Sequence, residues 1–360
     1  TGGQITAAQS ALLWTEGAAG DITLGATATS THGHLTIKSA DDVFINANAM
    51  VTNATPGDVG TLDIEAGTGY VTMLGTTTVT ATGSSMRIHA AKDISLSNLV
   101  ATDVSVFSTS GAILNSTNST TNVTANRHLS TSITTLTAKS TGTDSSGIYI
   151  TEADAVTIDT VAISITQFNA PATTTPVTDA AQSDLVSGNN GNIVLISNAG
   201  SITLNDGTSG NTDGKTVSAN GTGNVLIQAL GAGTDIVSNA NADVLSGTGN
   251  ISLLAAQSIS FAAGADVKTT VGTIDLVAGT GSITQSATSL IQSTTNTGNV
   301  RLSAATSVTV GDIESTSATV GILAGTGSIL DADALVSGVN DTDLDVSASK
   351  LMMTADMAIG

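Results

Sequence analysis

The segment GNISLLAAQSISFAAGADVKTT (residues 249–270) and the next one, GTIDLVAGTGSITQSATSLIQS (272–293), decide the fold. In both, aliphatic residues alternate with polar residues over short runs, which is typical of a β-strand with one buried face. In the first segment the runs are Ile251–Leu253, Ile259–Phe261 and a looser one near Val267. Small and polar residues separate the runs, as expected of tight turns. Each segment therefore predicts three short strands joined by three turns.

The same unit recurs along the chain at intervals of roughly 20–27 residues. The step from Val225 to Ile251 is 26 residues, the step to Ile274 is 23, and the step to Val300 is again 26. Such a period is typical of a β-solenoid, in which stacked coils bury the inward side chains of their neighbours. We therefore expect an all-β, right-handed parallel β-helix with about three short strands per coil. A β-sandwich also uses short alternating strands, but it has no sustained sequence period.

Stacking makes a specific prediction about register. Aligning LTIK (35–38), LDIE (62–65) and MRIH (86–89) places two sets of outward side chains in columns. These predicted columns are Lys38–Glu65–His89 and Thr36–Asp63–Arg87. Surface ion pairs between neighbouring coils contribute only about 0–1 kcal/mol, so their value would lie in fixing the register. The same spacing predicts that the coil after Val320 begins at Leu344.

Composition supports a thin aliphatic core and excludes several classes of protein. Of the 360 residues, 40% are hydrophobic but only 2% are aromatic, and Cys is absent. The net charge is −20 and the nine Lys and Arg residues are scattered. Binding to nucleic acid or to an anionic membrane requires a concentrated basic surface, so we expect neither. No apolar run is long enough for a membrane-spanning helix. A mean hydropathy of +0.27 argues against a disordered chain.

We expect residues 1–360 to form a single continuous solenoid. Residues 167–186 interrupt the repeat and contain Pro171 and Pro176. Proline cannot donate a hydrogen bond to a strand ladder, so this segment is predicted to be a loop that protrudes from the solenoid. Solenoid-like sequence reaches both ends of the chain, and open β-edges promote association. The chain is therefore expected to be part of a longer chain or of a polymer.

The repeated phrases also carry a resemblance. GNISLLA (249–255), GNVRLSA (298–304) and AGTGSI (278–283) resemble phrases of large bacterial surface proteins of the filamentous-haemagglutinin type. They are similar as well to the giant β-strand-repeat adhesins. The resemblance covers nearly the whole chain but rests on degenerate repeats. It implies a secreted, cell-surface protein whose right-handed β-helical shaft serves adhesion, aggregation or surface coating.

No catalytic or cofactor-binding residues are predicted, so we expect no enzyme. Enzymatic β-helices need carboxylates clustered with Lys or Arg on one face. The one acidic row here is predicted to point outward, together with two acidic residues of a neighbouring coil. Two interpretations stay open for this group: a solvated acidic face or a weak Ca²⁺ site, with Ca²⁺ as the one candidate cofactor. The residues are Asp341, Asp343 and Asp345 of the row, with Asp331 and Asp333 as the neighbours.

Two further motifs have a functional alternative. His32 and His34 could share a strand face and bind a transition metal, but no third ligand is evident, so surface turn histidines are favoured. A carbohydrate site needs an aromatic platform with convergent polar groups, and the sequence disperses Trp14, Tyr70 and Tyr149. The leading hypothesis is a non-catalytic, extracellular structural or adhesive fibre shaft that self-associates end to end. A carbohydrate-binding or carbohydrate-active β-helix that recognises cell-surface glycans, and a calcium-stabilised spacer, are the alternatives.

Overall fold

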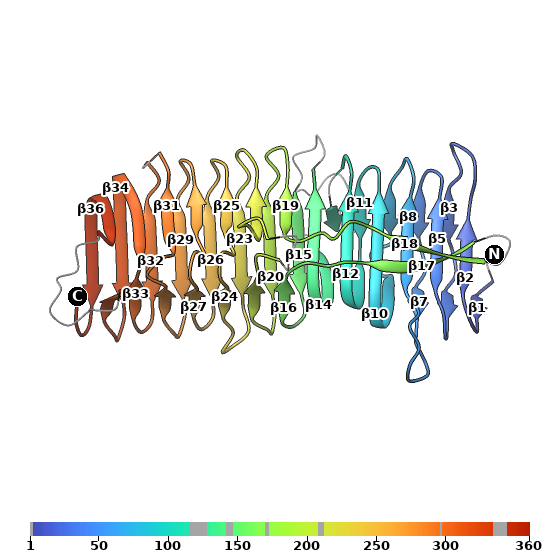
Figure 1. Cartoon of the computed structure of the whole chain (residues 1–360), viewed down its shortest axis with the longest axis horizontal. Coiled ribbons are helices and arrows are strands. Elements are labelled where there is room, and N and C mark those ends of the chain that lie inside the picture. The colour runs from blue at the N-terminus through green and yellow to red at the C-terminus, as the bar shows by residue number, and fades with distance from the viewer. Residues whose placement is uncertain are drawn as a thin grey trace. The chain divides into compact units, whose positions relative to one another are not determined.

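The computed structural model describes residues 3–111, 113–115, 128–141, 147–169, 173–207, 212–295, 297–333 and 344–360. Within these residues the chain consists of short strands and turns (Figure 1), with no helix that could span a membrane. Contacts divide the chain into two units. Unit 1 comprises Thr1–Ala153 and Thr160–Asn189, and unit 2 comprises Asp154–Asp159 and Asn190–Gly360.

Unit 2 is a parallel β-helix with three strand columns. Corresponding strands of consecutive coils pair in parallel, and the register joins Val225 to Ile251, Ile274, Val300 and Val320 in turn. This confirms the repeat alignment. The first column contains β20 (Ile193–Ser197), β23 (Val225–Ala229), β26 (Ile251–Ala255), β29 (Ile274–Ala278), β32 (Val300–Ala304), β34 (Asp312–Ala324) and β36 (Val346–Ala355). The second contains β16 (Val156–Ile158), β21 (Ile202–Leu204), β24 (Ile236–Ser238), β27 (Ile259–Phe261), β30 (Ile283–Gln285), β33 (Val308–Val310) and β35 (Ile329–Asp331). The third contains β22 (Val217–Ala219), β25 (Val244–Ser246), β28 (Val267–Thr269) and β31 (Leu290–Ser293), and continues into β34.

Unit 1 repeats this arrangement and adds an antiparallel hairpin. One column contains β2 (Ala11–Trp14), β5 (Leu35–Ser39), β8 (Leu62–Ala66), β10 (Thr78–Ala90), β12 (Asn98–Ser108), β14 (Leu129–Ser140) and β19 (Leu185–Ser187). The next contains β3 (Ile22–Leu24), β6 (Val43–Ile45), β9 (Val71–Met73), β11 (Ile94–Leu96), β13 (Ile113–Asn115) and β15 (Ile148–Glu152). The third contains β1 (Ile5–Ala7), β4 (Ala28–Ser30), β7 (Ala49–Val51) and the first part of β10. The hairpin is β17 (Ser164–Asn169) with β18 (Thr173–Thr178).

Aliphatic columns form the core of each unit. In unit 1, Leu35, Leu62, Met86, Val104 and Leu136 follow one another in register, and each is at most 1% exposed. Burying one such side chain contributes roughly 1.5–3 kcal/mol. Because every coil adds a few of these side chains, the core grows with the stack and requires no large aromatic residue.

The Gly-Asn pair that opens many coils of unit 2 has a direct physical role. The Asn250 side-chain oxygen accepts a hydrogen bond from the backbone N–H of Thr273 in the next coil at 2.9 Å, and Asn224 does the same for Asn250 at 2.8 Å. Glycine is required beside the asparagine, since a Cβ on Gly249 would lie 2.2 Å from the carbonyl oxygen of Gly223. The repeat phrase therefore encodes close backbone stacking together with a side-chain hydrogen bond to the following coil.

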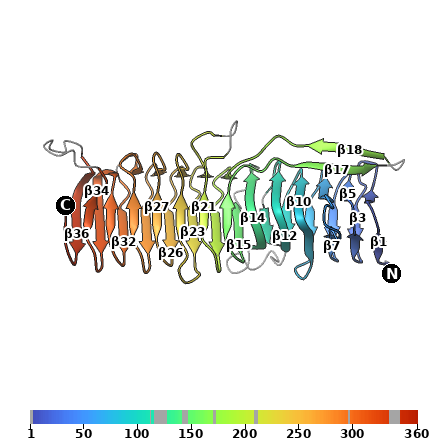
Figure 2. The same ribbon diagram turned by 60° about the horizontal axis from the view of Figure 1, so that its bottom comes forward.

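The structure bears on three predicted boundaries along the chain. The protruding loop expected at 167–186 is wrong. The end of β17 and all of β18 lie in this segment and form an antiparallel hairpin, and its last residues belong to β19, which pairs in parallel with β14. Figure 2 shows the hairpin lying across the strands of unit 1, and β17 contacts β2, β5 and β8. The predicted coil start at Leu344 is wrong, because Val320 pairs with Leu351 and Leu344 is 70% exposed. Because contacts divide the chain into two units, a single continuous solenoid over residues 1–360 stays a prediction.

Candidate functional site

The outward columns predicted for unit 1 are confirmed in register. Asp63 lies between Thr36 and Arg87, and Glu65 lies between Lys38 and His89. The Lys38 ammonium is 3.1 Å from Glu65 Oε1. The Thr36–Asp63–Arg87 column differs from the surface column that we expected. Asp63 and Arg87 are buried, with 1% and 4% of their surfaces exposed.

The β17–β18 hairpin is the reason for this burial. Arg87 donates to Asp63 Oδ1 at 2.9 Å and also pairs with Asp179, which directly follows β18. The Gln167 side chain, which lies on β17, donates to Asp63 Oδ2 at 3.3 Å. The hairpin therefore closes over a polar column and satisfies it with its own side chains.

Both members of this buried pair have displaced pKa values. Burial raises the pKa of Asp63, and the Arg87 charge opposes that rise. Burial alone would lower the pKa of Arg87, but its hydrogen bond to Asp179 and the charge of Asp63 raise it above the ordinary value. A guanidinium with these neighbours stays charged, and so it acts here as a fixed structural cation.

An open groove of about 480 Å³ lies beside the hairpin, entirely within unit 1. Its aromatic side chain is Trp14, which is 46% exposed. Sequence reasoning missed this site because it treated 167–186 as a protruding loop, and only the folded hairpin brings amides and hydroxyls next to Trp14. The lining residues are Leu12, Trp14 and Lys38 from strands β2 and β5, with Gln167, Asn169, Thr173 and Thr175 from the hairpin.

The predicted acidic group of unit 2 is brought together in part. Carboxylate oxygens of Asp331, Asp333 and Asp345 lie within 4.8 Å of one another. Asp341 and Asp343 lie outside the described residues. Three carboxylates at this spacing could supply part of the six to eight oxygens that Ca²⁺ takes. The calcium site itself stays a prediction.

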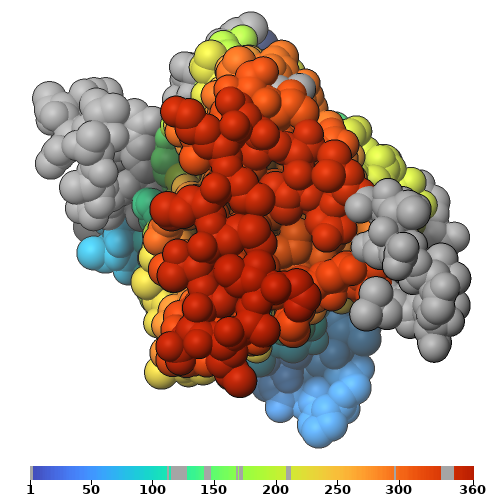
Figure 3. Space-filling model, turned by 90° about the vertical axis from the view of Figure 1, so that its left-hand side faces the viewer, coloured from blue at the N-terminus to red at the C-terminus, as the bar shows by residue number. Residues whose placement is uncertain are grey.

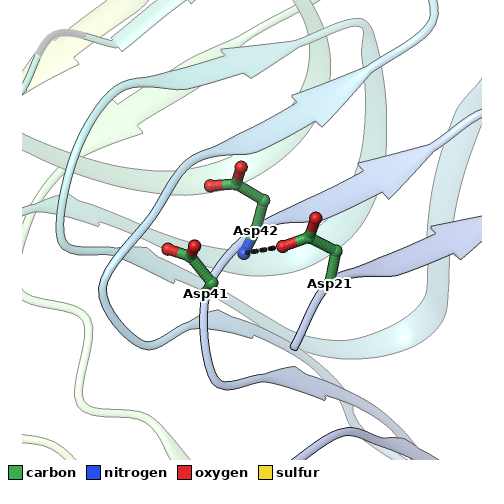
Figure 4. A group of neighbouring side chains, drawn as sticks. All are labelled: Asp21, Asp41 and Asp42. Atoms are coloured by element: carbon green, nitrogen blue, oxygen red, sulfur yellow. Dashed lines mark hydrogen bonds between the residues drawn. The ribbon is translucent and has the colours of Figure 1, made fainter. Parts of the chain in front are cut away.

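A second acidic group, which the sequence analysis did not identify, lies in unit 1. Asp21, Asp41 and Asp42 have carboxylate oxygens within 4.8 Å of one another (Figure 4). Asp21 accepts from the Asp42 backbone N–H at 3.2 Å, and Asp42 accepts from the Tyr70 N–H at 2.7 Å. Asp21 and Asp42 therefore repeat the coil-to-coil hydrogen bond that asparagine makes in unit 2, and Asp41 accepts from the Thr68 hydroxyl at 2.9 Å, so each carboxylate has a structural partner.

The two histidines of the THGH motif have separate structural partners. His32 Nδ1 lies 2.9 Å from Asp58 Oδ2, whereas His34 Nδ1 accepts a hydrogen bond from the Thr61 backbone N–H at 3.1 Å. Burial lowers the pKa of His34, which favours the neutral ring that this bond requires. His34 thus takes the place of an asparagine in the coil-to-coil ladder.

Relatives add no information about these sites. Comparison of the chain with protein-family models, with curated proteins and with solved structures finds no match.

Proposed function

We propose that this chain is a non-catalytic shaft segment of an extracellular surface fibre. The observation that carries the proposal is the register of the coils. Equivalent strands of successive coils pair residue for residue in each unit, with aliphatic columns inside and small polar residues outside. A ladder of this kind resists bending and pulling through many parallel backbone hydrogen bonds. Its outer surface is free to vary without loss of the core.

Self-association is the second part of the proposal. Leu351 pairs in register with buried Val320, yet it is 47% exposed, because none of the described residues covers it. Figure 3 shows the C-terminal coil of unit 2, in red, facing the viewer. Met352, which points the other way on the same strand, is 62% exposed. A further coil stacked on β36 would bury Leu351, which supports association at this strand.

Electron microscopy of the native material, together with sedimentation velocity of the purified chain, tests the proposal. We expect fibres in the microscope and concentration-dependent association in solution. Leu351→Lys should abolish the association, because it places a charge at the end of the aliphatic column. Met352→Lys is the matched control and should leave it largely intact. A chain that stays monomeric at high concentration, or a Leu351→Lys variant that associates normally, would contradict end-to-end stacking.

The calcium-stabilised spacer is the second candidate, and it is motivated by the proximity of Asp331, Asp333 and Asp345. A structural Ca²⁺ ion would raise the melting temperature of unit 2 through its binding free energy. The melting temperature should then fall on addition of a chelator, and Asp331→Asn should remove that response. Identical melting with and without chelator would discard this function and leave the shaft proposal untouched.

A further inference from the structure

The groove beside the hairpin combines features that recognise sugars, and the argument is independent of the proposed shaft function. Trp14, the single tryptophan of the chain, is 46% exposed on one side of the groove. Its indole N–H makes no hydrogen bond with the described residues. An exposed indole has a large apolar face and a polar edge, which suits a ligand that is apolar on one face and polar at its rim. A pyranose ring has this character.

The hairpin supplies the polar groups that such a ligand requires. The Asn169 side-chain amide donates to Thr175 Oγ1 at 2.9 Å and to the Gln167 carbonyl at 3.4 Å. Its Oδ1 accepts no hydrogen bond from the described residues. Thr173 and Thr175 add hydroxyl groups, each of which can donate and accept. Sugar hydroxyls likewise donate and accept, so a few convergent side chains of this type can orient a saccharide.

The groove is also held in shape before any ligand arrives. Gln167 is 7% exposed and is tied to Asp63, Asp63 is tied to Arg87, and Arg87 is tied to Asp179 at the end of the hairpin. These contacts hold the hairpin against β8 and β10, through Gln167 on β17 and through Asp179, which follows β18. A site built in advance avoids part of the ordering cost of binding.

The charges near the groove favour a neutral ligand. Lys38, the one charged residue of the lining, already lies 3.1 Å from Glu65. Lys38 and Arg87 face three carboxylates in the same network, those of Asp63, Glu65 and Asp179. This balance offers no surplus positive charge to an acidic saccharide, and the whole chain carries a net charge of −20.

We propose that the groove between strands β2–β5 and the β17–β18 hairpin of unit 1 binds a neutral oligosaccharide. The apolar face of one sugar ring lies against Trp14, and Asn169 with the neighbouring threonines holds its hydroxyls.

The single tryptophan makes the test direct, because every fluorescence change of the full chain under selective excitation comes from Trp14. The chain is titrated with cellotriose, maltotriose and N-acetyllactosamine, and with a heparin disaccharide as the acidic probe. We expect at least one neutral probe to shift Trp14 emission to shorter wavelength and to protect it from acrylamide. Raising the salt concentration should leave this binding unchanged, since screening acts on charged partners.

Two variants and a control place the ligand in the groove. Asn169→Ala keeps the fluorophore and should weaken binding about tenfold, the factor that corresponds to roughly 1.4 kcal/mol. Trp14→Ala removes the fluorophore, so its binding is measured by calorimetry. We expect no measurable binding. Tyr70→Ala removes a different exposed aromatic residue of unit 1, 39% exposed and outside the groove lining, and should bind normally. Unchanged amide hydrogen exchange in β5 and β8 shows that a variant is folded.

Three outcomes would overturn the proposal. The first is an unchanged Trp14 emission with all three neutral probes. The second is binding that Asn169→Ala and Trp14→Ala leave unaffected in folded protein. The third is binding of the acidic probe alone, weakened by salt. None of these results bears on fibre formation, so the shaft proposal is tested separately.

Discussion

Two aspartate–arginine pairs, one in each unit, each join neighbouring coils and have opposite surroundings. Asp63 pairs in register with Arg87 in unit 1, and Asp275 pairs in register with Arg301 in unit 2. Their N–O distances are 2.9 and 2.8 Å. The side chains of the first pair are 1% and 5% exposed, and those of the second are 39% and 55% exposed. The β17–β18 hairpin, which covers only the first pair, accounts for the difference.

The comparison shows that the solenoid determines where an outward pair lies, while a separate segment determines how much that pair matters. An exposed ion pair is solvated in either case and contributes about 0–1 kcal/mol. A covered pair has lost its water, and so each charge depends on the other. The same repeat can thus present a dispensable surface contact in one unit and an essential buried one in the other.

The largest expected effect separates these two pairs. Arg87→Met should destabilise unit 1 by about 3–5 kcal/mol, because it leaves the buried Asp63 carboxylate without its cation. Arg301→Met should change the stability of unit 2 by at most about 1 kcal/mol. Amide hydrogen exchange measured separately in β8 and β29 reports each unit. Equal effects of the two substitutions would mean that the hairpin does not exclude water from Asp63.

The next effect should be the same in both units, since it concerns stacking alone. A Cβ at Gly60 of unit 1 would lie 2.2 Å from the Gly33 carbonyl oxygen, and one at Gly272 of unit 2 would lie 2.0 Å from that of Gly249. Gly60→Ala and Gly272→Ala should each cost about 1–3 kcal/mol through overpacking. Gly321→Ala is the control, because its nearest atom would be the Met352 Cε at 3.7 Å. Urea unfolding followed by hydrogen exchange in each unit measures all three variants. Normal stability of the Gly60 and Gly272 variants would show that neighbouring coils leave room for a Cβ at these positions.

A smaller effect concerns the hydrogen bonds between coils. Asn250 accepts from both the backbone N–H and the hydroxyl of Thr273, at 2.9 and 3.0 Å. Asn250→Ala should therefore cost about 0.5–1.5 kcal/mol and speed exchange of the Thr273 amide. Asn250→Asp keeps the acceptor oxygen and should restore most of the loss. If Asn250→Ala changed neither the stability nor the exchange of the Thr273 amide, the hydrogen bonds of the ladder would not contribute to stability.

The smallest effects are pH-dependent and should have opposite signs in the two units. Burial lowers the pKa of His34 in unit 1, so the unfolded chain binds a proton more readily than the folded one. The stability that His34 contributes is present above about pH 6.5 and is lost as the pH falls below that value. His34→Asn keeps an acceptor for Thr61 and should remove this acid sensitivity. Identical pH dependence of the variant and the parent in unit 1 would contradict the assignment.

In unit 2, burial raises the pKa of Asp243 to about 6. The folded form then binds a proton more tightly than the unfolded form, so stability rises as the pH falls through about 6 and is lost as it rises again. Lys268, 3.8 Å from Asp243, reduces the effect without reversing it. Asp243→Asn should abolish the gain, and hydrogen exchange in β25 at pH 7 and pH 5 measures it. If the Asp243→Asn variant gained as much stability between pH 7 and pH 5 as the parent, the gain would not originate from Asp243.

Sequence reasoning predicted whatever repeats from coil to coil. The pairing of Leu35 with Leu62 and of Val225 with Ile251 follows from the spacing of aliphatic residues, and the structure has that register. The prediction failed at Leu344 because spacing identifies a coil only while the turns keep their length. The step from Val320 to its actual partner, Leu351, includes a longer connection.

The hairpin and its groove could not be predicted in the same way. Gln167 contacts Asp63 across 104 positions of the sequence, and Arg87 contacts Asp179 across 92. Neither separation is related to the repeat. Pro176 indicated correctly that its own strand does not join the parallel ladder, since it lies in the antiparallel pair with β17, whereas the end of the segment does join the ladder through β19. The prolines carry no information about the surface on which the segment folds.

The asparagine ladder gives each coil a direction as well as a position. In every step the oxygen belongs to the earlier coil and the N–H belongs to the later one, as from Asn192 to Asn224 and from Asn224 to Asn250. Loss of one asparagine therefore removes the acceptor of the coil that follows it, while the bond to the coil before it stays in place, because that bond uses the backbone N–H.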